Sequence, residues 1–312
     1  MGLKRSLLLL KDSFLFIHTM MEGKKIMKEI LTNAHKFILT NARLLERRLF
    51  EVHFEGLSPN YVGRVVCAYQ NSDGGLGHGL EPDVRCPESQ PLFVSQGLEA
   101  LEEAGYRDIE FATSLCDYIE SVSDSKGLVP FFMESAYQSP IASHWNEMTV
   151  TPGLNPTMNI CGLLHYQGVQ HEWLTLATET CCNMFFKNPP LEAHTLHCAS
   201  RLAEYIPDKK IAMNLLDVIE KSLSQANFFI PGTPVETYGL TPLHFAHKPD
   251  SICRQLFTQS QIDSHLEDLV KKQLPDGGWP IWWEPPGLAS ELEWRGRWTL
   301  DALFRLSSYG VL

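Results

Sequence analysis

The sequence predicts a protein made only of α-helices, and three observations carry this prediction. Apolar residues recur at helical spacing along much of the 312-residue chain. Turn-forming residues separate these periodic stretches, and the chain lacks the runs of β-branched residues that a buried parallel sheet needs. Hydrophobic residues make up 44% of the chain and charged residues 20%, which is typical of a folded protein rather than a disordered one.

The predicted helices follow one another along the chain. The first runs from Ile26 to Phe50, where apolar residues form one broad stripe that a helix packs against a core. The later ones are Pro91 to Ala104, Phe111 to Ile119, Met158 to Tyr166, Trp173 to Phe186, Leu191 to Ile206, Ile211 to Leu223, Ile262 to Leu274 and Trp294 to Tyr309. Two other stretches, Leu128 to Thr151 and Phe228 to Pro249, lack helical spacing and are rich in aromatic residues, Pro or His. Because long loops in a compact domain are commonly functional, we expect both to lie over a pocket.

The first residues resemble the start of a signal peptide without completing it. Lys4 and Arg5 precede four leucines, but charged residues then interrupt the apolar run, and no small-residue cleavage site follows. We therefore expect residues 1–23 to form a flexible extension and residues 24–312 to form one domain. No later segment is apolar over the length that spans a bilayer, so we expect no transmembrane segment, while peripheral contact with a membrane stays open.

Charge and cysteine content narrow the class of partner and the compartment. The formal net charge of -11 argues against nucleic-acid binding, because such proteins use Lys and Arg to neutralise phosphates. The 8 cysteines are scattered without Cys-x-x-Cys spacing, which favours a reduced cytoplasmic protein over a disulfide framework. We therefore expect a cytoplasmic protein whose partner is a small molecule.

Two blocks near opposite ends of the chain share one pattern. The block from Gln70 to Gly75 (Gln-Asn-Ser-Asp-Gly-Gly) matches the block from Gln273 to Gly278 (Gln-Leu-Pro-Asp-Gly-Gly). Each block follows a helical segment, and its glycines permit a tight reversal while its Asp can hydrogen-bond the turn backbone. Such a repeat predicts helix pairs that stack side by side.

The second block resembles the QW motif of squalene-hopene and oxidosqualene cyclases. In that motif an aromatic residue or Leu precedes Gln, and Gly-x-Trp follows. The matching residues are Leu269, Gln273, Gly277 and Trp279, whereas Val66 and Leu76 replace the first and last of these in the other block. The resemblance implies an all-α fold of the α/α toroid type, a barrel of helical hairpins with QW-like repeats. It also implies that Gln273 and Trp279 are structural rather than catalytic.

From about Asn60 to Gly310 the chain is similar to bacterial prenyltransferase or squalene-oxidase repeat proteins of unestablished activity. The similarity rests on the blocks Asp73 to Arg85, Leu154 to Thr157 with Gly162 to His165, Glu192 to His194, and Glu293 to Gly296. The Asp-x-Asp-Asp motif of class II cyclases and the Asp-Asp-x-x-Asp motif of class I terpene synthases and prenyl-diphosphate synthases are absent. The Asp, Cys and His that bind zinc in protein prenyltransferase β-subunits have no clear match. The resemblance therefore predicts a fold without a particular reaction.

The densest polar cluster lies in the predicted loop after the first block. The residues assigned to catalysis are Asp73, His78, Glu81, Asp83 and Arg85. Carboxylates held near an Arg and a His would differ in pKa, which leaves one protonated as an acid, and Glu81 and Asp83 are the best candidates. The structural alternative is that Asp73 caps the turn and Arg85 pairs with a carboxylate, so that the segment orders a long loop.

A second constellation contains Glu192, His194, His197 and Cys198. Spacings of three and four residues bring His194, His197 and Cys198 together on a helix, which is chemically compatible with zinc. A closed zinc site would need further ligands, so buried, hydrogen-bonded histidines are the prediction and no metal is expected. No nucleophile elbow, P-loop, dinucleotide fingerprint or His-Glu-x-x-His motif occurs, and we expect no cofactor.

Aromatic residues in the predicted loops complete the candidate site. Their ring faces could stabilise developing carbocations or stack against sugar rings. The residues assigned to substrate binding are Trp145, Asn155, His165, His194, Tyr238, Trp282, Trp283, Glu293 and Arg295. For Glu293 and Arg295, a salt bridge at the start of a helix is the alternative.

The leading functional hypothesis is a terpenoid cyclase-like or prenyltransferase-like enzyme. It would process an isoprenoid or another small apolar molecule in a central pocket, with Glu81 or Asp83 as proton donor. The first alternative is a carbohydrate-active enzyme, a glycosidase or a lyase, because α/α toroids also host such enzymes with Trp-lined clefts. The second alternative is a non-catalytic binding protein or scaffold, in which Asp73, Glu81, Asp83 and Arg85 satisfy one another.

Overall fold

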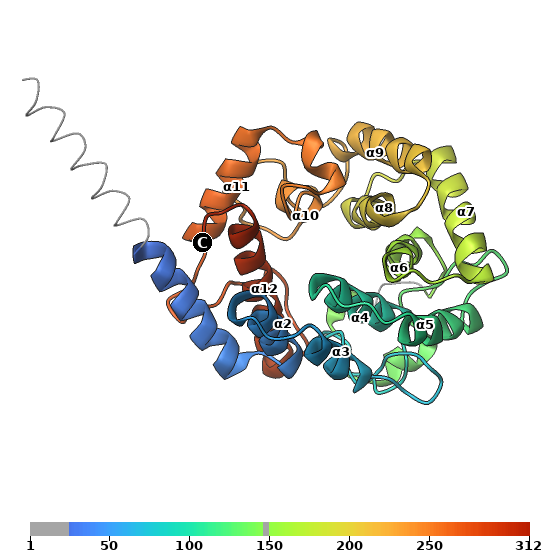
Figure 1. Ribbon diagram of the computed structural model, residues 1–312, viewed down its shortest axis with the longest axis horizontal. Coiled ribbons are helices and arrows are strands. Elements are labelled where there is room, and N and C mark those ends of the chain that lie inside the picture. Colours follow the sequence, from blue (N-terminus) through green and yellow to red (C-terminus); the bar gives the residue numbers. More distant parts are fainter. Residues whose placement is uncertain (1–24, 146–149) are drawn as a thin grey trace, which may run out of the picture.

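The computed structural model describes residues 25–145 and 150–312 (Figure 1). The extension predicted over residues 1–23 lies outside the described residues, as do residues 146–149 of the first predicted loop. The helices are residues 25–41, α2 (Leu44–Glu55), α3 (Asn60–Cys67), α4 (Pro91–Glu103), α5 (Ile109–Ser121), α6 (Leu154–Gln167), α7 (Glu172–Lys187), α8 (Ala193–Tyr205), α9 (Lys209–Leu223), α10 (Pro242–Phe245), α11 (Gln259–Lys271) and α12 (Leu288–Ser308). Three short 3-10 helices are η1 (Glu134–Gln138), η2 (Ser143–Trp145) and η3 (Ile252–Leu256).

The all-helical class is confirmed. The described ranges contain isolated β-bridges but no strand. Every predicted helix after the first coincides with an observed one, and their ends differ by a few residues. None of the described helices has the length and apolarity that crossing a membrane requires.

Three elements differ from the sequence prediction. The helix predicted from Ile26 to Phe50 is two helices, because the chain leaves helical geometry at Arg43, which has an extended backbone (φ -66°, ψ 167°). The apolar pattern continues through this break because both helices pack on the same core. The third helix, α3, has 8 residues, and α10 has 4, so both are too short for their periodicity to be seen.

The helices lie in two layers around a common centre. Figure 1 shows the even-numbered helices inside, with residues 25–41 and the odd-numbered helices outside them. Along the inner layer α2 contacts α4, α4 contacts α6, α6 contacts α8, and α8 contacts α10, while α12 contacts α2. The rings of His244 in α10 and Trp298 in α12 have centroids 6.2 Å apart. The inner helices therefore surround the centre on all sides.

The two repeated blocks fold into the same turn. In each block the Asp carboxylate accepts a hydrogen bond from the second glycine, at 3.0 Å in Gln70 to Gly75 and at 3.1 Å in Gln273 to Gly278. In each, the Gln amide donates to the carbonyl oxygen of the first glycine at 3.0 Å. Matching side-chain and backbone bonds mean that the shared sequence pattern encodes one local structure at both places.

The first glycine of each turn packs against the backbone of an outer helix. Gly74 has φ 87° and faces Ser114 of α5, and Gly277 has φ 93° and faces Asn33 in the helix of residues 25–41. A Cβ at Gly277 would lie 2.2 Å from the Asn33 carbonyl oxygen, a distance that no real Cβ keeps. Only glycine has both the conformation and the size that these positions need.

A third turn of this kind lies between α5 and α6, where the sequence pattern did not reveal it. Asp124 accepts hydrogen bonds from the backbone N–H groups of Lys126 and Leu128, both at 2.9 Å. Gly127 has φ 81° and packs against Ala177 of α7, where a Cβ would lie 3.2 Å from the Ala177 Cα. Each turn thus packs on the next outer helix, and the turn after α11 packs on the first helix of the described chain.

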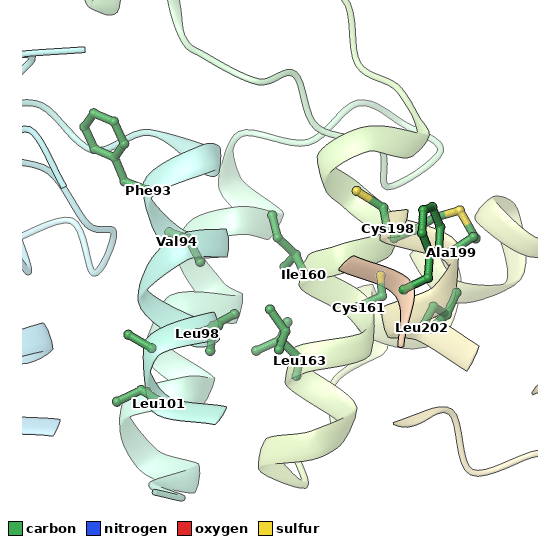
Figure 2. Close-up of a cluster of buried hydrophobic side chains, with 14 of the residues drawn as sticks. Phe93, Val94, Leu98, Leu101, Ile160, Cys161, Leu163, Cys198, Ala199 and Leu202 are labelled. Atoms are coloured by element: carbon green, nitrogen blue, oxygen red, sulfur yellow. The ribbon is translucent and has the colours of Figure 1, made fainter. Parts of the chain in front are cut away.

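The buried core is continuous between the layers. Figure 2 shows Val94, Leu98 and Leu101 of α4 near Ile160 and Leu163 of α6, with α8 on the far side of α6. The α6 and α8 backbones approach closely because Gly162 lies against the Arg201 carbonyl, where a Cβ would come within 2.6 Å. This packing holds the inner helices at fixed distances around the centre.

Candidate functional site

A cavity of about 600 Å³ lies between the inner helices. Its walls come from α2, α4, α8, α10 and α12 and from the chain around residues 80–82 and 238–240. The charged residues of its lining are Arg43, Glu46, Glu99, Glu102, Glu103, Arg201, Lys248, Arg297, Asp301 and Arg305, and the histidines are His53, His194, His197, His244 and His247. The lining is therefore rich in charge and in hydrogen-bonding groups.

A chain of three side chains reaches this cavity at the start of α8. Glu192 caps the helix, accepting from the backbone N–H groups of His194 at 3.0 Å and Thr195 at 2.9 Å. The same carboxylate is hydrogen-bonded to Nδ1 of His194, whose Nε2 lies 2.8 Å from the hydroxyl of Tyr238. Since Glu192 requires a proton on Nδ1, the Nε2 lone pair of neutral His194 accepts from the Tyr238 hydroxyl.

The surroundings of Glu192 and Tyr238 determine the protonation state of both groups at neutral pH. Burial alone would raise the pKa of Glu192, but the hydrogen bond from His194, the positive charge of that ring when it is protonated, and the backbone hydrogen bonds lower it to about 2. Burial, together with the negative charges of Glu192, Glu81 and Asp83, raises the pKa of Tyr238 to about 12. The carboxylate is therefore ionised and the phenol is protonated in the resting protein.

The Trp283 ring packs against the Tyr238 ring, and its indole N–H is hydrogen-bonded to Asp83. The two aromatic rings meet edge to face with centroids 5.6 Å apart. The indole Nε1 of Trp283 donates to Asp83 at 2.8 Å, and the Ser290 hydroxyl donates to the same carboxylate at 3.0 Å. Asp83 therefore positions the wall of the cavity rather than entering it.

Glu81 lies next to Asp83 and is also withdrawn from the cavity. It is 1% exposed, and the side-chain amide of Gln96, which does line the cavity, donates a hydrogen bond to it. Burial and the neighbouring Asp83 charge raise the pKa of Glu81, so its protonated form is favoured. Glu81 and Asp83 do not face each other across a cleft, because the Asp83 backbone N–H lies 3.4 Å from the Glu81 carboxylate on the same loop.

Ion pairs between inner helices form much of the remaining lining. Arg201 of α8 donates to Glu102 of α4 at 2.6 Å, and Arg297 of α12 pairs with Glu103 of α4 and with Asp301 at 2.9 Å. Burial raises the pKa of Glu103 despite the nearby Arg297 charge. These pairs link three inner helices across the layer and satisfy most of the buried charges.

The cavity lining does not include the other residues assigned to catalysis, nor Glu293 and Arg295, which were assigned to substrate binding. Asp73 is exposed and accepts within its turn, and His78 is exposed with φ 58°. Arg85 forms two hydrogen bonds to Glu293, at 2.5 and 3.3 Å, which join the loop to α12. Arg295 pairs at 2.8 Å with the Asp of the second repeated block. The structure therefore gives each of them a structural partner or an exposed position away from the Glu192–His194–Tyr238 relay.

Three residues assigned to substrate binding lie apart from His194 and Tyr238, and a fourth, Trp282, lines a smaller cavity together with Tyr238. Trp145 packs against Phe131 and Phe132, and the ring of His165 lies 3.1 Å from a hydroxyl of α7. Asn155 begins α6 with an extended backbone (φ -101°, ψ 123°). Trp282 lines a second, smaller cavity of about 70 Å³ that shares Tyr238 with the first.

Several lining residues were not among the predicted site residues. Glu99, Glu102 and Glu103 project from α4, and Arg297, Asp301 and Arg305 project from α12. The sequence does indicate that the three charged residues of α12 share one helix face, because Arg297, Asp301 and Arg305 are spaced four residues apart. That face also carries Leu300 and Leu303 close by, so the charges could not be assigned to the inside from sequence alone.

The zinc alternative finds no further ligands. Cys198 is buried, and burial raises the pKa of its thiol, which disfavours the thiolate that binds metals. Within residues 25–145 and 150–312, no group of three or more His, Cys, Asp or Glu side chains is placed to hold a metal ion.

The chain matches no family model and no curated protein. Its cavity is therefore the basis for the functional proposal.

Proposed function

We propose that this protein is an α/α toroid whose central cavity binds a polar, polyhydroxylated substrate such as a saccharide and acts on it by acid–base chemistry. The observation that carries the proposal is the hydrogen-bonded chain from Glu192 through His194 to Tyr238 in the cavity wall. Among the three functions considered from the sequence, this one corresponds to the carbohydrate-active enzyme.

Support for the toroid comes from two features of the helix arrangement. The inner helices surround one centre, and α12 returns to contact α2. The turn after α11 packs on the helix of residues 25–41, as the turns before α4 and α6 pack on α5 and α7. A repeated packing step that joins the last unit to the first is what a closed ring of helical hairpins requires.

Support for a polar substrate comes from the cavity lining. A hydrocarbon would displace water from Glu99, Arg305 and the histidines without replacing its hydrogen bonds, which costs about 1–3 kcal/mol for each group left unpaired. Hydroxyl groups both donate and accept, so a sugar can replace that water. The rings of Trp294 and Trp298, which also line the cavity, offer faces for sugar stacking.

The relay supplies a general base and an acid in one unit. As a substrate proton moves to the Tyr238 oxygen, the phenolic proton moves to Nε2 of His194, so that the phenol never carries a full charge. The resulting imidazolium is stabilised by the ionised Glu192 on its Nδ1 side, the same logic by which an Asp supports the His of a hydrolase triad. Reversal of the transfer returns a proton to a leaving group.

The test is turnover by the Tyr238→Phe variant. Purified protein is incubated with neutral and acidic oligosaccharides, and products are followed by mass spectrometry. Tyr238→Phe keeps the ring that packs on Trp283 but removes the hydroxyl, so turnover is expected to fall by about 100-fold or more. Tyr61→Phe is the matched control, because Tyr61 is 42% exposed on α3 and lies outside the cavity lining.

Equal activity of Tyr238→Phe and wild type would exclude the relay as the catalytic unit. Absence of both binding and turnover across the saccharide panel would favour the non-catalytic scaffold instead. The isoprenoid hypothesis remains a second candidate, because Glu81 has a raised pKa and is hydrogen-bonded to Gln96, which lines the cavity. Cyclised products from linear isoprenoids, lost in Glu81→Gln, would establish that alternative.

A further inference from the structure

One cation in the cavity lacks a carboxylate partner. Arg43, Arg201, Arg297 and Lys248 each lie within ion-pair distance of a carboxylate. The guanidinium of Arg305 in α12 makes no hydrogen bond or ion pair within the part of the chain that the structure describes, although it lines the cavity. The nearest carboxylate on its own helix, Asp301, is already engaged by Arg297. The lining therefore carries one unmatched guanidinium.

A histidine beside Arg305 has an unused donor. The backbone N–H of Thr241 donates to Nδ1 of His244 at 2.9 Å, so in the neutral ring the proton resides on Nε2. The Nε2 atom is buried and has no hydrogen-bond partner. Burial and the Arg305 charge lower the pKa of His244 well below its usual value, which keeps the ring neutral. A buried N–H without an acceptor costs free energy unless a ligand supplies one.

Both groups lie where the two cavities meet. Arg305, His244, Tyr238 and Trp298 are the residues that line the larger and the smaller cavity alike. His197, which also lines the larger cavity, is held neutral by burial and by the Arg201 charge, which lower its pKa to about 3. The junction therefore combines the unpaired Arg305 cation with the Nε2–H donor of neutral His244, and Tyr238 lines it as well.

We infer that this junction is a subsite for a carboxylate group of the ligand, held by the Arg305 guanidinium and the Nε2–H of His244. The planar guanidinium fork matches a carboxylate, which can accept from both donors at once. A single unmatched positive charge, with the negative Asp301 one turn away, fits a monoanion better than a dianionic phosphate. The inference rests on the proposed saccharide function and narrows it to acidic sugars of the uronic acid type.

Isothermal titration calorimetry with three ligands of similar size tests the subsite on wild-type protein. The ligands are glucuronate, its neutral methyl ester and glucose 6-phosphate. Glucuronate is expected to bind at least about tenfold more tightly than the ester, as a charge-assisted hydrogen bond predicts. Equal affinity for acid and ester would overturn the subsite while leaving the saccharide proposal standing. Tighter binding of glucose 6-phosphate than of glucuronate would also overturn it. Failure of all three ligands to bind would overturn both.

Variants then assign the preference to the junction. Arg305→Gln is expected to reduce the preference for acid over ester to about onefold, whereas Arg64→Gln, on the exposed face of α3, keeps it. Tyr238→Phe is expected to keep the preference for the acid even where turnover is lost, which separates the subsite from the relay. An unchanged preference in Arg305→Gln would refute the assignment, and the comparison on wild-type protein decides the question if that variant does not fold.

Discussion

Replacing Gly277 with Ala should weaken the fold where its last turn meets its first described helix. Gly277 has φ 93°, and an added Cβ would lie 2.2 Å from the carbonyl oxygen and 2.6 Å from the carbonyl carbon of Asn33. The left-handed conformation costs about 1–2 kcal/mol for a residue with a Cβ. Overlap with a backbone that is fixed inside a helix adds about 1–3 kcal/mol. The expected loss is therefore about 2–5 kcal/mol.

Gly56 provides a matched control for the conformational part of this cost. It has φ 74°, and an added Cβ there would meet nothing within 4 Å. Gly56→Ala is therefore expected to lose only about 1–2 kcal/mol. Urea denaturation of both variants gives the two free energies of unfolding, and thermal melts should place Gly277→Ala at least a few degrees below Gly56→Ala. If the two variants lose equal stability, the close approach of Gly277 to Asn33 does not contribute to the stability of the fold, and the reasoning from overlap is wrong.

Three further predictions follow from buried charges. Burial raises the pKa of Glu81 in the folded state from its ordinary value of 4.5 to about 8, so the stability that its protonated form contributes is fully present below the ordinary value and is lost as pH rises to the folded value. Glu81→Gln should therefore be close to wild type in urea denaturation near about pH 4 and more stable than wild type near about pH 9, and it should be less harmful than Gly277→Val at neutral pH; an equal difference at both pH values would mean that this pKa is not raised. Arg201→Met leaves Glu102 buried without its partner and should cost about 3–5 kcal/mol, and Arg201→Met combined with Glu102→Leu should recover most of it, whereas a double variant as unstable as the single one would contradict the pairing. Asp83→Asn keeps one acceptor oxygen and places an amide N–H₂ group opposite either the Trp283 or the Ser290 donor, so where it faces Trp283 the indole loses its acceptor and the tryptophan fluorescence maximum should shift to longer wavelength; an unchanged spectrum would show that Asp83 does not hold the indole.

Much of the fold could be predicted from the sequence, because helix formation leaves a local signature. The apolar spacing of the chain from α4 to α9, of α11 and of α12 predicted their positions within a few residues. The break after residue 41 and the short α10 could not be predicted in this way. Spacing reports which side of a helix is buried, and it does not report where the axis changes direction.

The candidate site could be predicted only in part. His194, Tyr238 and Trp283 were among the assigned residues, and the structure brings them together with Glu192. Asp83 was assigned as a proton donor, but its contacts with Trp283 and Ser290 make it a support for the cavity wall. Whether Glu81 acts as an acid remains a prediction.

Sequence alone determined the all-helical class and the shape of the repeated turns, since both depend on residues within a few positions of one another. Only the tertiary structure decided that Arg305 and His244 line the same two cavities as Tyr238, because Arg305 and His244 lie on different helices, α12 and α10. It also decided which carboxylates face the cavity. A charged side chain on an amphipathic helix can point outward to water or inward to a polar cavity, and its local pattern is the same in both cases. The direction depends on the helices opposite, whose positions are set by packing between residues far apart in the chain.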